Sequence, residues 1–330
     1  MKVLRPGLLT TVQDTGRYGH QREGVSVGGA MDLMALRVAN LLVGNPEGAA
    51  ALEFTLAGPT LEFTHGRLIA ICGARMSPVI AGQPVPEGRP VLVRAGAVLS
   101  FGQCTLGAHG CIAVAGGIDV PVVLGSRSTH LRARFGGLGG RALAVDDVLP
   151  VGPASEAAVR TAGALASRAE VFAATSWSVS ASALPPYSPA PRIRTIPGTH
   201  VARFSESSRR AFFDQPFRVT PQSDRMGYRL EGTRLEMSQP LEPISEPVCA
   251  GTVQVPPEGQ PIVLMADRQT AGGYPRIAQV ITVDLPLIAQ TKPGDSLRFT
   301  EVSLEEAQHL YVERERAMEE VRQGLMHAAH

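Results

Sequence analysis

Short apolar runs separated by turn residues recur along most of the chain, and they predict β-strands. Residues 68–71 (LIAI) and 91–93 (VLV) belong to a first series between residues 51 and 150, and residues 262–265 (IVLM) belong to a second series after Arg192. Successive runs are about ten residues apart, which is typical of a barrel or a sandwich. The pattern therefore favours a mainly β fold over alternating βα units.

Two segments show the spacing of a helix instead. Residues 31–45 carry apolar side chains at intervals of three and four, and the sequence Gly44-Asn45-Pro46 ends that pattern. From Leu304 onward, apolar side chains recur at seven-residue steps as far as Leu325. This second pattern predicts an amphipathic C-terminal helix, which packs either on its own domain or on a partner.

The chain is long enough for two domains. Its 330 residues exceed the roughly 150 residues of one typical domain. We expect an N-terminal β domain at residues 1–152, which includes the helix at 31–45, and a C-terminal β domain at residues 192–330, which includes the last helix. Residues 153–191 are rich in Ala, Ser and Pro and are interpreted as an interdomain connection, with a short helix around residues 156–168 as an option.

Composition and charge narrow the range of functions. The chain has 35 glycines and 26 prolines, too many for a helical bundle. Its formal net charge is only +1, so no overall field attracts nucleic acid or an anionic membrane. No apolar run approaches the roughly 20 residues that span a bilayer, and the first residues do not resemble a signal peptide. We therefore expect a soluble, cytoplasmic protein that binds neither nucleic acid nor membrane.

Standard catalytic and metal-binding motifs are missing from the sequence. It contains no G-x-S-x-G elbow, no H-E-x-x-H and no phosphate-binding G-x-x-x-x-G-K-[ST] loop. The four cysteines, Cys72, Cys104, Cys111 and Cys249, form no C-x-x-C pair. We expect them to be small buried apolar residues and expect no metal site.

Two glycine-rich polar segments in the N-terminal half carry candidate chemistry, because function concentrates on loops. In residues 10–19 the candidates are Gln13, Asp14 and Arg17, and the last two either pair or face an anion together. Residues 125–141 combine arginines, hydroxyls and glycines, which are the materials of an oxyanion or phosphate cradle. The candidates of that second segment are Arg127, Ser128, Thr129 and Arg132. Alternatively, its arginines cap loop carbonyls or pair with acids such as Asp146 and Asp147.

Two further polar segments lie in the C-terminal half. Residues 223–230 supply Asp224, Arg225 and Tyr228. Residues 262–275 begin as a strand and continue as a loop with a carboxylate, an amide, a hydroxyl and a phenol, which suit an amide-like substrate. These four groups belong to Asp267, Gln269, Thr270 and Tyr274. Alternatively, the loop is a turn that satisfies its own backbone.

Together these segments resemble the allophanate hydrolase subunit 2 / KipA family, also called the biotin-dependent carboxyltransferase family. The resemblance covers nearly the whole chain and rests on residues 10–19, 29–32, 39–45, 51–55, 116–121, 124–129, 223–230, 253–257 and 262–275. The chain departs from the family at residues 25–29, where a Pro-x-Ser-Gly string is usual, and in its longer, Ala-rich connection.

The resemblance implies two cyclophilin-like β-barrel subdomains with a few short helices and a C-terminal helix. It also implies a component of an ATP-dependent 5-oxoprolinase, which opens the cyclic amide 5-oxoproline to glutamate together with a KipI-like subunit and a LamB/YcsF-like subunit. One alternative is the carboxyltransferase component of a biotin-dependent urea carboxylase in the allophanate pathway. Another is a KipA-type regulator that binds a KipI-like kinase inhibitor.

Under the first of these functions, the complex uses ATP and the isolated chain is not expected to be active. Arg127, Ser128 and Thr129, with Arg225, would steady an anionic group. The loop at 267–274 would hold the amide or carboxylate of the substrate. The catalytic candidates are Asp267, which is the first choice for a general base, Arg225 and Tyr274. The binding candidates are Gln13, Asp14, Arg17, Arg127, Ser128, Thr129, Arg132, Asp224, Tyr228, Gln269 and Thr270. This site requires positions 14, 127, 225 and 270 to converge.

Overall fold

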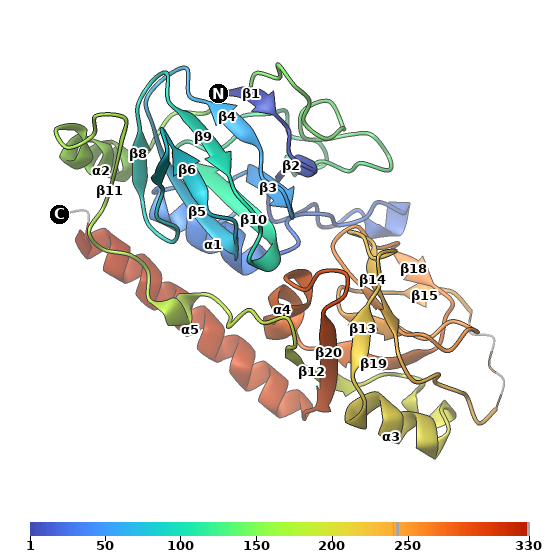
Figure 1. Ribbon diagram of the computed structural model, residues 1–330. Coiled ribbons are helices and arrows are strands. Elements are labelled where there is room, and N and C mark those ends of the chain that lie inside the picture. The colour runs from blue at the N-terminus through green and yellow to red at the C-terminus, as the bar shows by residue number, and fades with distance from the viewer. Residues whose placement is uncertain (240, 242–243, 329–330) are drawn as a thin grey trace. The chain divides into compact units, whose positions relative to one another are not determined.

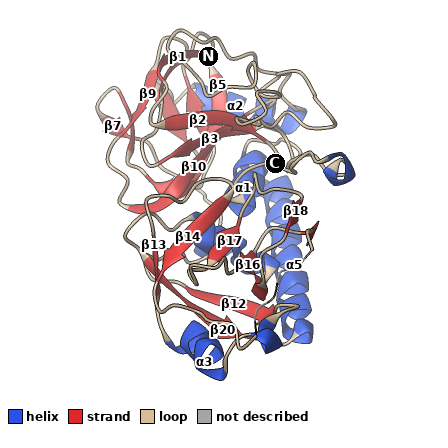
Figure 2. Cartoon of the chain, turned by 90° about the vertical axis from the view of Figure 1, so that its right-hand side faces the viewer, coloured by secondary structure: helices blue, strands red, loops and turns tan. Residues whose placement is uncertain are grey.

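Two compact units make up the structure, a computed structural model that describes residues 1–239, 241 and 244–328 (Figure 1). Unit 1 comprises Met1–Arg17, Gly28–Leu184 and the described chain from Arg316 onward, and unit 2 comprises Tyr18–Val27 and Pro185–Glu315. Figure 2 shows strands throughout both units. The mainly β fold predicted from the sequence is confirmed.

Unit 1 contains two antiparallel sheets. The first has the order β1 (Lys2–Arg5), β4 (Thr60–Glu62), β9 (Val98–Phe101), β6 (Pro78–Ile80) and β7 (Gln83–Pro84). The second has the order β11 (Phe172–Ala174), β8 (Val91–Val93), β5 (Arg67–Arg75), β10 (Leu106–Val114), β3 (Ala51–Thr55) and β2 (Leu9–Gln13). Both sheets pack around a common core, whereas the family resemblance implied a barrel here.

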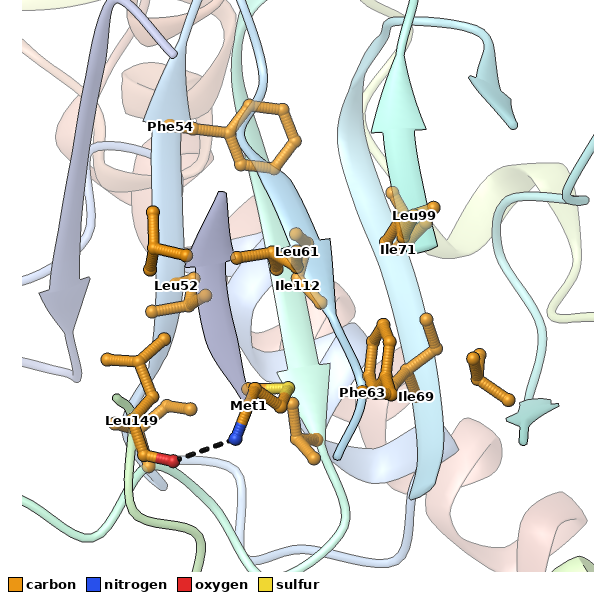
Figure 3. Packing of buried hydrophobic residues seen from close by; sticks show 14 of the residues in the cluster. Met1, Leu52, Phe54, Leu61, Phe63, Ile69, Ile71, Leu99, Ile112 and Leu149 are labelled. Carbon is orange, nitrogen blue, oxygen red and sulfur yellow. Dashed lines mark hydrogen bonds between the residues drawn. The ribbon is translucent and has the colours of Figure 1, made fainter. Parts of the chain in front are cut away.

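Alternate side chains of both sheets point into this core, as the period of two in a strand requires. Leu61 and Leu99 enter from the first sheet, and Ile69, Ile71 and Ile112 enter from the second (Figure 3). All five are fully buried, and each contributes about 1.5–3 kcal/mol relative to an exposed position. Packing between the two sheets therefore supplies the main stabilisation of unit 1.

Helices cover the other face of the six-stranded sheet in unit 1. Helix α1 (Leu33–Leu42) packs its apolar stripe against the outward residues of β5 and β10. It begins two residues later than predicted because the Asp32 side chain accepts a hydrogen bond from the Ala35 amide (2.9 Å) and caps the helix. The predicted C-terminal helix is confirmed as α5 (Leu304–Ala328), whose Met318 is buried in the same cluster. None of the described helices combines the length and the apolar character needed to cross a membrane.

Unit 2 is a closed barrel. Its strands follow the order β12 (Arg192–Pro197), β19 (Arg276–Val280), β16 (Thr252–Gln254), β17 (Ile262–Leu264), β14 (Gly227–Glu231), β13 (Phe217–Val219) and β20 (Ser296–Glu301). The parallel pairing of β20 with β12 closes the barrel, and the other neighbours are antiparallel. Phe212 of α3 (Glu206–Asp214) stacks on Phe299 of β20, with ring centroids 4.3 Å apart.

The remaining elements are short. They are α2 (Glu156–Ala166), α4 (Leu285–Ala289), the two-stranded sheet of β15 (Glu246–Pro247) and β18 (Ala271–Gly272), and the 3-10 helices η1 (Gln21–Glu23), η2 (Ala181–Ala183), η3 (Val201–Arg203) and η4 (Thr282–Asp284).

The boundaries of the two units differ from the predicted domains at three segments. Residues 153–184 are part of unit 1, because β11 pairs with β8 and α2 packs Ala158 and Leu165 into the helix-covered cluster. Residues 18–27 belong to unit 2, where the Ser26 hydroxyl donates to the Arg268 carbonyl (2.7 Å). The end of α5 belongs to unit 1 through Met318.

Gly110 on β10 provides a test of the packing in unit 1. It lies directly across from Phe54 of β3, and a Cβ at Gly110 would come within 2.3 Å of the Phe54 ring. We expect Gly110→Ala to lower the free energy of unfolding by about 1–3 kcal/mol through overpacking. Equilibrium urea unfolding measures this change.

Gly163→Ala is the matched control, because Gly163 lies in α2 and a Cβ there meets nothing within 4 Å. The same substitution should stabilise the protein at this position, by about 0.5–1 kcal/mol, since alanine favours the helix. Equal effects of the two substitutions would contradict the packing of Phe54 over Gly110.

Candidate functional site

Asp14 organises the first group of predicted site residues, which lies in unit 1. Asp14 directly follows β2, and its buried carboxylate accepts hydrogen bonds from the hydroxyls of Ser126 (2.6 Å) and Ser128 (2.5 Å). It also accepts from the backbone amides of Arg127 (2.6 Å) and Gly16 (2.8 Å). In return, the Asp14 amide donates to the Ser128 hydroxyl (2.9 Å). The carboxylate thus ties two segments together that are more than 100 residues apart.

Gln13, Arg17 and Thr129 complete this buried group. The Gln13 amide nitrogen donates to the Thr129 carbonyl, and the Thr129 hydroxyl donates to the carbonyl of Val12. Arg17 is only 1% exposed; it donates to the Ser128 carbonyl (2.5 Å) and its guanidinium lies over the ring of Phe135 (4.7 Å). These polar groups therefore form hydrogen bonds within the protein's own loops.

Arg127 differs from its neighbours because its side chain is partly exposed. It donates to the Val120 carbonyl (2.8 Å) and forms an ion pair with Asp119 (2.9 Å). The alternative that Arg127 caps a loop carbonyl is therefore realised, with Asp119 as its acidic partner. Asp147 pairs with Arg141 and Asp146 pairs with Lys2. The predicted Arg132 is exposed.

Arg225 and Asp267 form a buried ion pair in unit 2. Arg225 precedes β14 and Asp267 follows β17, and the antiparallel pairing of Gly227 with Leu264 brings the two ends together. The Arg225 guanidinium donates to both oxygens of Asp267, at 2.8 and 3.1 Å, and the Asp267 amide donates to the Arg225 carbonyl (2.8 Å). In this bidentate contact Asp267 acts on Arg225 by fixing the direction of the guanidinium.

The remaining candidates of residues 223–230 hold local structure. One oxygen of Asp224 accepts from the amides of Met226 (2.8 Å) and Gly227 (3.1 Å) and so shapes the turn before β14. The Tyr228 side chain is buried, and its hydroxyl donates to the Ala289 carbonyl (2.9 Å). Both groups satisfy backbone atoms of the protein.

The loop after β17 offers several polar groups of unit 2. Tyr274 is 46% exposed, and Thr270 is half-buried with its carbonyl bound to the Val248 amide. Gln269 donates to the side-chain oxygen of Gln254 (3.5 Å). Burial lowers the pKa of Arg268, and the neighbouring Cys249, Tyr18 and Asp267 raise it in part.

Sequence reasoning missed Gln254 and Arg268. Gln254 is 1% exposed at the end of β16, and the sequence pattern places it only within the family-like segment 253–257. Its strand gives no clear signal, because Thr252 in the same three residues is also polar. Arg268 stands beside a candidate in the sequence, and its backbone carbonyl accepts a hydrogen bond from the distant Ser26 hydroxyl.

The described part of the chain also contains two cavities away from these groups. One, of about 890 Å³, lies in unit 1 between the end of α1, α2, Trp177 and the end of α5. The other, of about 680 Å³, lies in unit 2 between β12 and the start of α5. None of the predicted site residues lines either cavity.

The cysteines divide into two kinds. Cys72 and Cys111 are buried, and desolvation raises the pKa of both thiols. Cys104 is half-buried. The prediction was wrong for Cys249, which is exposed, because it lies in the loop before β16 and not in a strand.

Asp14 and Arg127 lie in unit 1, whereas Arg225 and Thr270 lie in unit 2. Each unit thus brings its own candidates together, Gln13, Asp14, Arg17, Ser128 and Thr129 in the first and Arg225 with Asp267 in the second. Convergence of the two groups on one substrate stays a prediction.

Comparisons with known proteins agree with the family resemblance. A family model described as "Carboxyltransferase domain, subdomain A and B" matches residues 23–301. The C subunit of the 5-oxoprolinase of Escherichia coli (strain K12) is 40% identical over 321 residues, which cover 97% of each chain.

Two solved structures are also similar. The Kluyveromyces lactis urea carboxylase superimposes with a TM-score of 0.88 at 29% identity; the match covers 98% of this chain but only 29% of that protein. The protein TTHA0988 superimposes with a TM-score of 0.76 at 35% identity, over 90% of this chain and 54% of that one. The fold is therefore shared with parts of longer proteins.

The contacts of Asp14 predict a large structural effect of its removal. Asp14→Ala leaves buried hydroxyl and amide donors without their acceptor, and we expect it to lower the free energy of unfolding by about 3 kcal/mol. Asp119→Ala removes the partly exposed partner of Arg127 and should change it by less than about 1 kcal/mol. Urea unfolding of both variants is the measurement. A cost for Asp14→Ala as small as that for Asp119→Ala would contradict the structural role and return Asp14 to the anion-binding candidates.

Proposed function

This chain belongs to the family of carboxyltransferase domains that consist of subdomains A and B, and we propose that it is a component of a 5-oxoprolinase. The observation that carries this proposal is the 40% identity to the Escherichia coli 5-oxoprolinase component over 97% of both chains. That match runs through both units of the structure. The substrate of the assembly is then the cyclic amide 5-oxoproline, and the product is glutamate.

The other chains of the enzyme are part of the proposal. A relative that is named as one lettered subunit of an enzyme works with further subunits, and we assign a KipI-like chain and a LamB/YcsF-like chain to these places. The length of TTHA0988 supports the proposal of a partner chain, because the part similar to this chain makes up only 54% of that protein. The isolated chain is accordingly proposed to be inactive.

Chemistry explains why such an assembly would use ATP. A lactam is a poor electrophile, and transfer of the terminal phosphoryl group of ATP to its oxygen would create an oxygen that can leave as phosphate. One water molecule adds to the ring carbon, and the C–N bond breaks as the ring nitrogen takes up a proton, which leaves an acyl phosphate. A second water molecule displaces the phosphate, so that both oxygens of the new carboxylate come from water. Preorganised cations and N–H donors stabilise the charge that develops in such a step.

Within this chain, Arg225 is the group best prepared for that task. Its guanidinium is buried and held in one direction by Asp267, so no reorganisation is needed when negative charge appears nearby. We assign Asp267 to positioning Arg225. The partly exposed Arg127, Thr270 and Tyr274 are assigned to contacts with the substrate or the partner chains.

A carboxyltransferase function is the second candidate. It is favoured by the TM-score of 0.88 to a urea carboxylase. The match covers only 29% of that protein, so a carboxylase function of this chain would need further domains or chains that supply biotin and load it.

Reconstitution decides between the two functions. The chain is mixed with its KipI-like and LamB/YcsF-like partners, ATP and 5-oxoproline, and glutamate is measured. Glutamate should form only when all three chains are present. The second function replaces the first under two conditions. The three chains form no more glutamate than the two partner chains alone, and they transfer a carboxyl group from a carboxylated biotin carrier to urea.

The role of Arg225 is tested by Arg225→Lys, which keeps the charge but loses the planar fork that binds both oxygens of Asp267. We expect kcat of the assembly to fall by about tenfold or more, while KM changes little, since the guanidinium acts on developing charge. Arg229→Lys is the control, because Arg229 lies on the adjacent β14 with an exposed side chain. A kcat for Arg225→Lys equal to that of Arg229→Lys would exclude the proposed role.

A further inference from the structure

Gln254 occupies an unusual place for an amide. It is the last residue of β16, and its side chain is 1% exposed. The neighbouring Val253 is fully buried and, because successive side chains alternate, points to the other side of the sheet. Gln254 therefore shares its side of the sheet with Thr252, whose hydroxyl donates to the side-chain oxygen of Gln279 (2.9 Å).

The hydrogen bonds of Gln254 use only one end of its amide. Oε1 accepts from Nε2 of Gln269 (3.5 Å). No atom of the described residues accepts from Nε2 of Gln254, although this nitrogen is buried. Such a group costs about 1–3 kcal/mol in a folded protein, and its retention calls for an explanation such as an acceptor that arrives with a ligand.

Gly272 shows where the two amide groups meet. A Cβ at Gly272 would lie 2.7 Å from Nε2 of Gln254 and 3.2 Å from Nε2 of Gln269. Both nitrogens therefore lie close to the backbone of Gly272, and a methyl group there would collide with the amide of Gln254. The φ of Gly272 is not in the left-handed region, so this glycine serves the close approach of the amides and not a special backbone turn. The pairing of β18 with β15 holds Gly272 in place.

Two arginines near these glutamines, one in sequence and one in strand pairing, also carry a donor without an acceptor among the described residues. Arg268 precedes Gln269, and its buried Nε has no acceptor among the residues that the structure describes. Arg276 lies across from Gln254 on β19, and the same holds for its Nε, although its terminal nitrogen pairs with Glu246 (3.1 Å). A ligand that suits these groups brings acceptor oxygens, as an amide carbonyl or a carboxylate does.

We propose that Nε2 of Gln254 and Nε2 of Gln269 together bind the lactam carbonyl oxygen of the substrate, beside the backbone of Gly272. The assignment of the lactam rests on the proposed function. Two donors on one carbonyl oxygen orient the ring and favour the state in which that oxygen carries more negative charge.

The test uses the reconstituted assembly and three variants of this chain. Gln254→Leu removes the donor at similar size, Gly272→Ala inserts a methyl group against Nε2 of Gln254, and Gln222→Leu changes an exposed glutamine as the control. We expect the first two to raise KM for 5-oxoproline by about tenfold or more, as the loss of a buried hydrogen bond to the substrate predicts. The control should match the wild type.

The melting temperature separates binding from structure. Gln254→Leu removes a buried nitrogen that has no hydrogen-bond acceptor among the described residues, so it should leave Tm unchanged or raise it. A clear fall in Tm for Gln254→Leu would assign Gln254 to the fold and overturn the proposal. Kinetic constants of Gln254→Leu equal to those of the control would overturn it as well.

A binding measurement keeps this inference apart from the proposed function. Association of 5-oxoproline with the assembly, without ATP, is followed by ligand-observed NMR. We expect binding to the wild type and about tenfold weaker binding to Gln254→Leu. If the wild-type assembly binds 5-oxoproline but forms no glutamate with ATP, only the proposed function is contradicted. Equal binding to both proteins, or none to the wild type, counts against the amide pair.

Discussion

The carboxylate of Asp14 is the interaction on which the polar loops of unit 1 depend. It accepts from two hydroxyls and two backbone amides in a buried setting, and each of these donors would otherwise be desolvated without a partner. A single acid thus determines the path of residues 126–128 and the position of the end of β2. Arg17 also holds this segment, because it donates to the Ser128 carbonyl and its guanidinium lies over the ring of Phe135.

In unit 2 the corresponding constraint is strand register. The pairing of β14 with β17 sets Arg225 opposite Asp267, and the pairing of β16 with β19 sets Gln254 across from Arg276. The barrel is closed, so its strands cannot slide past one another. The side chains at the ends of these strands are therefore held in fixed positions. The loop after β17 therefore presents its polar groups from a rigid base.

Local patterns predicted the parts of the fold that depend on nearby residues. The apolar spacing placed α5 and most of α1, and the short runs identified many of the strands in both units. The direction of polar side chains could not be predicted in this way. Ser128 and Thr129 were expected to bind an anionic group of the substrate. The Ser128 hydroxyl donates to the carboxylate of Asp14, 114 residues away, and only the assembled sheet brings these two residues together. The same holds for Gln254, whose side-chain oxygen accepts from Gln269, 15 residues away in the loop after β17.

The division of the chain between the units has a consequence for synthesis on the ribosome. Unit 1 contains Met1–Arg17 and also Met318, which is buried among the helices on the six-stranded sheet. Its packing is complete only after the chain has emerged from the exit tunnel as far as Met318, whereas unit 2 lies between these segments in the chain. Until then, the apolar surface that Met318 covers is open to chaperones and to neighbouring nascent chains.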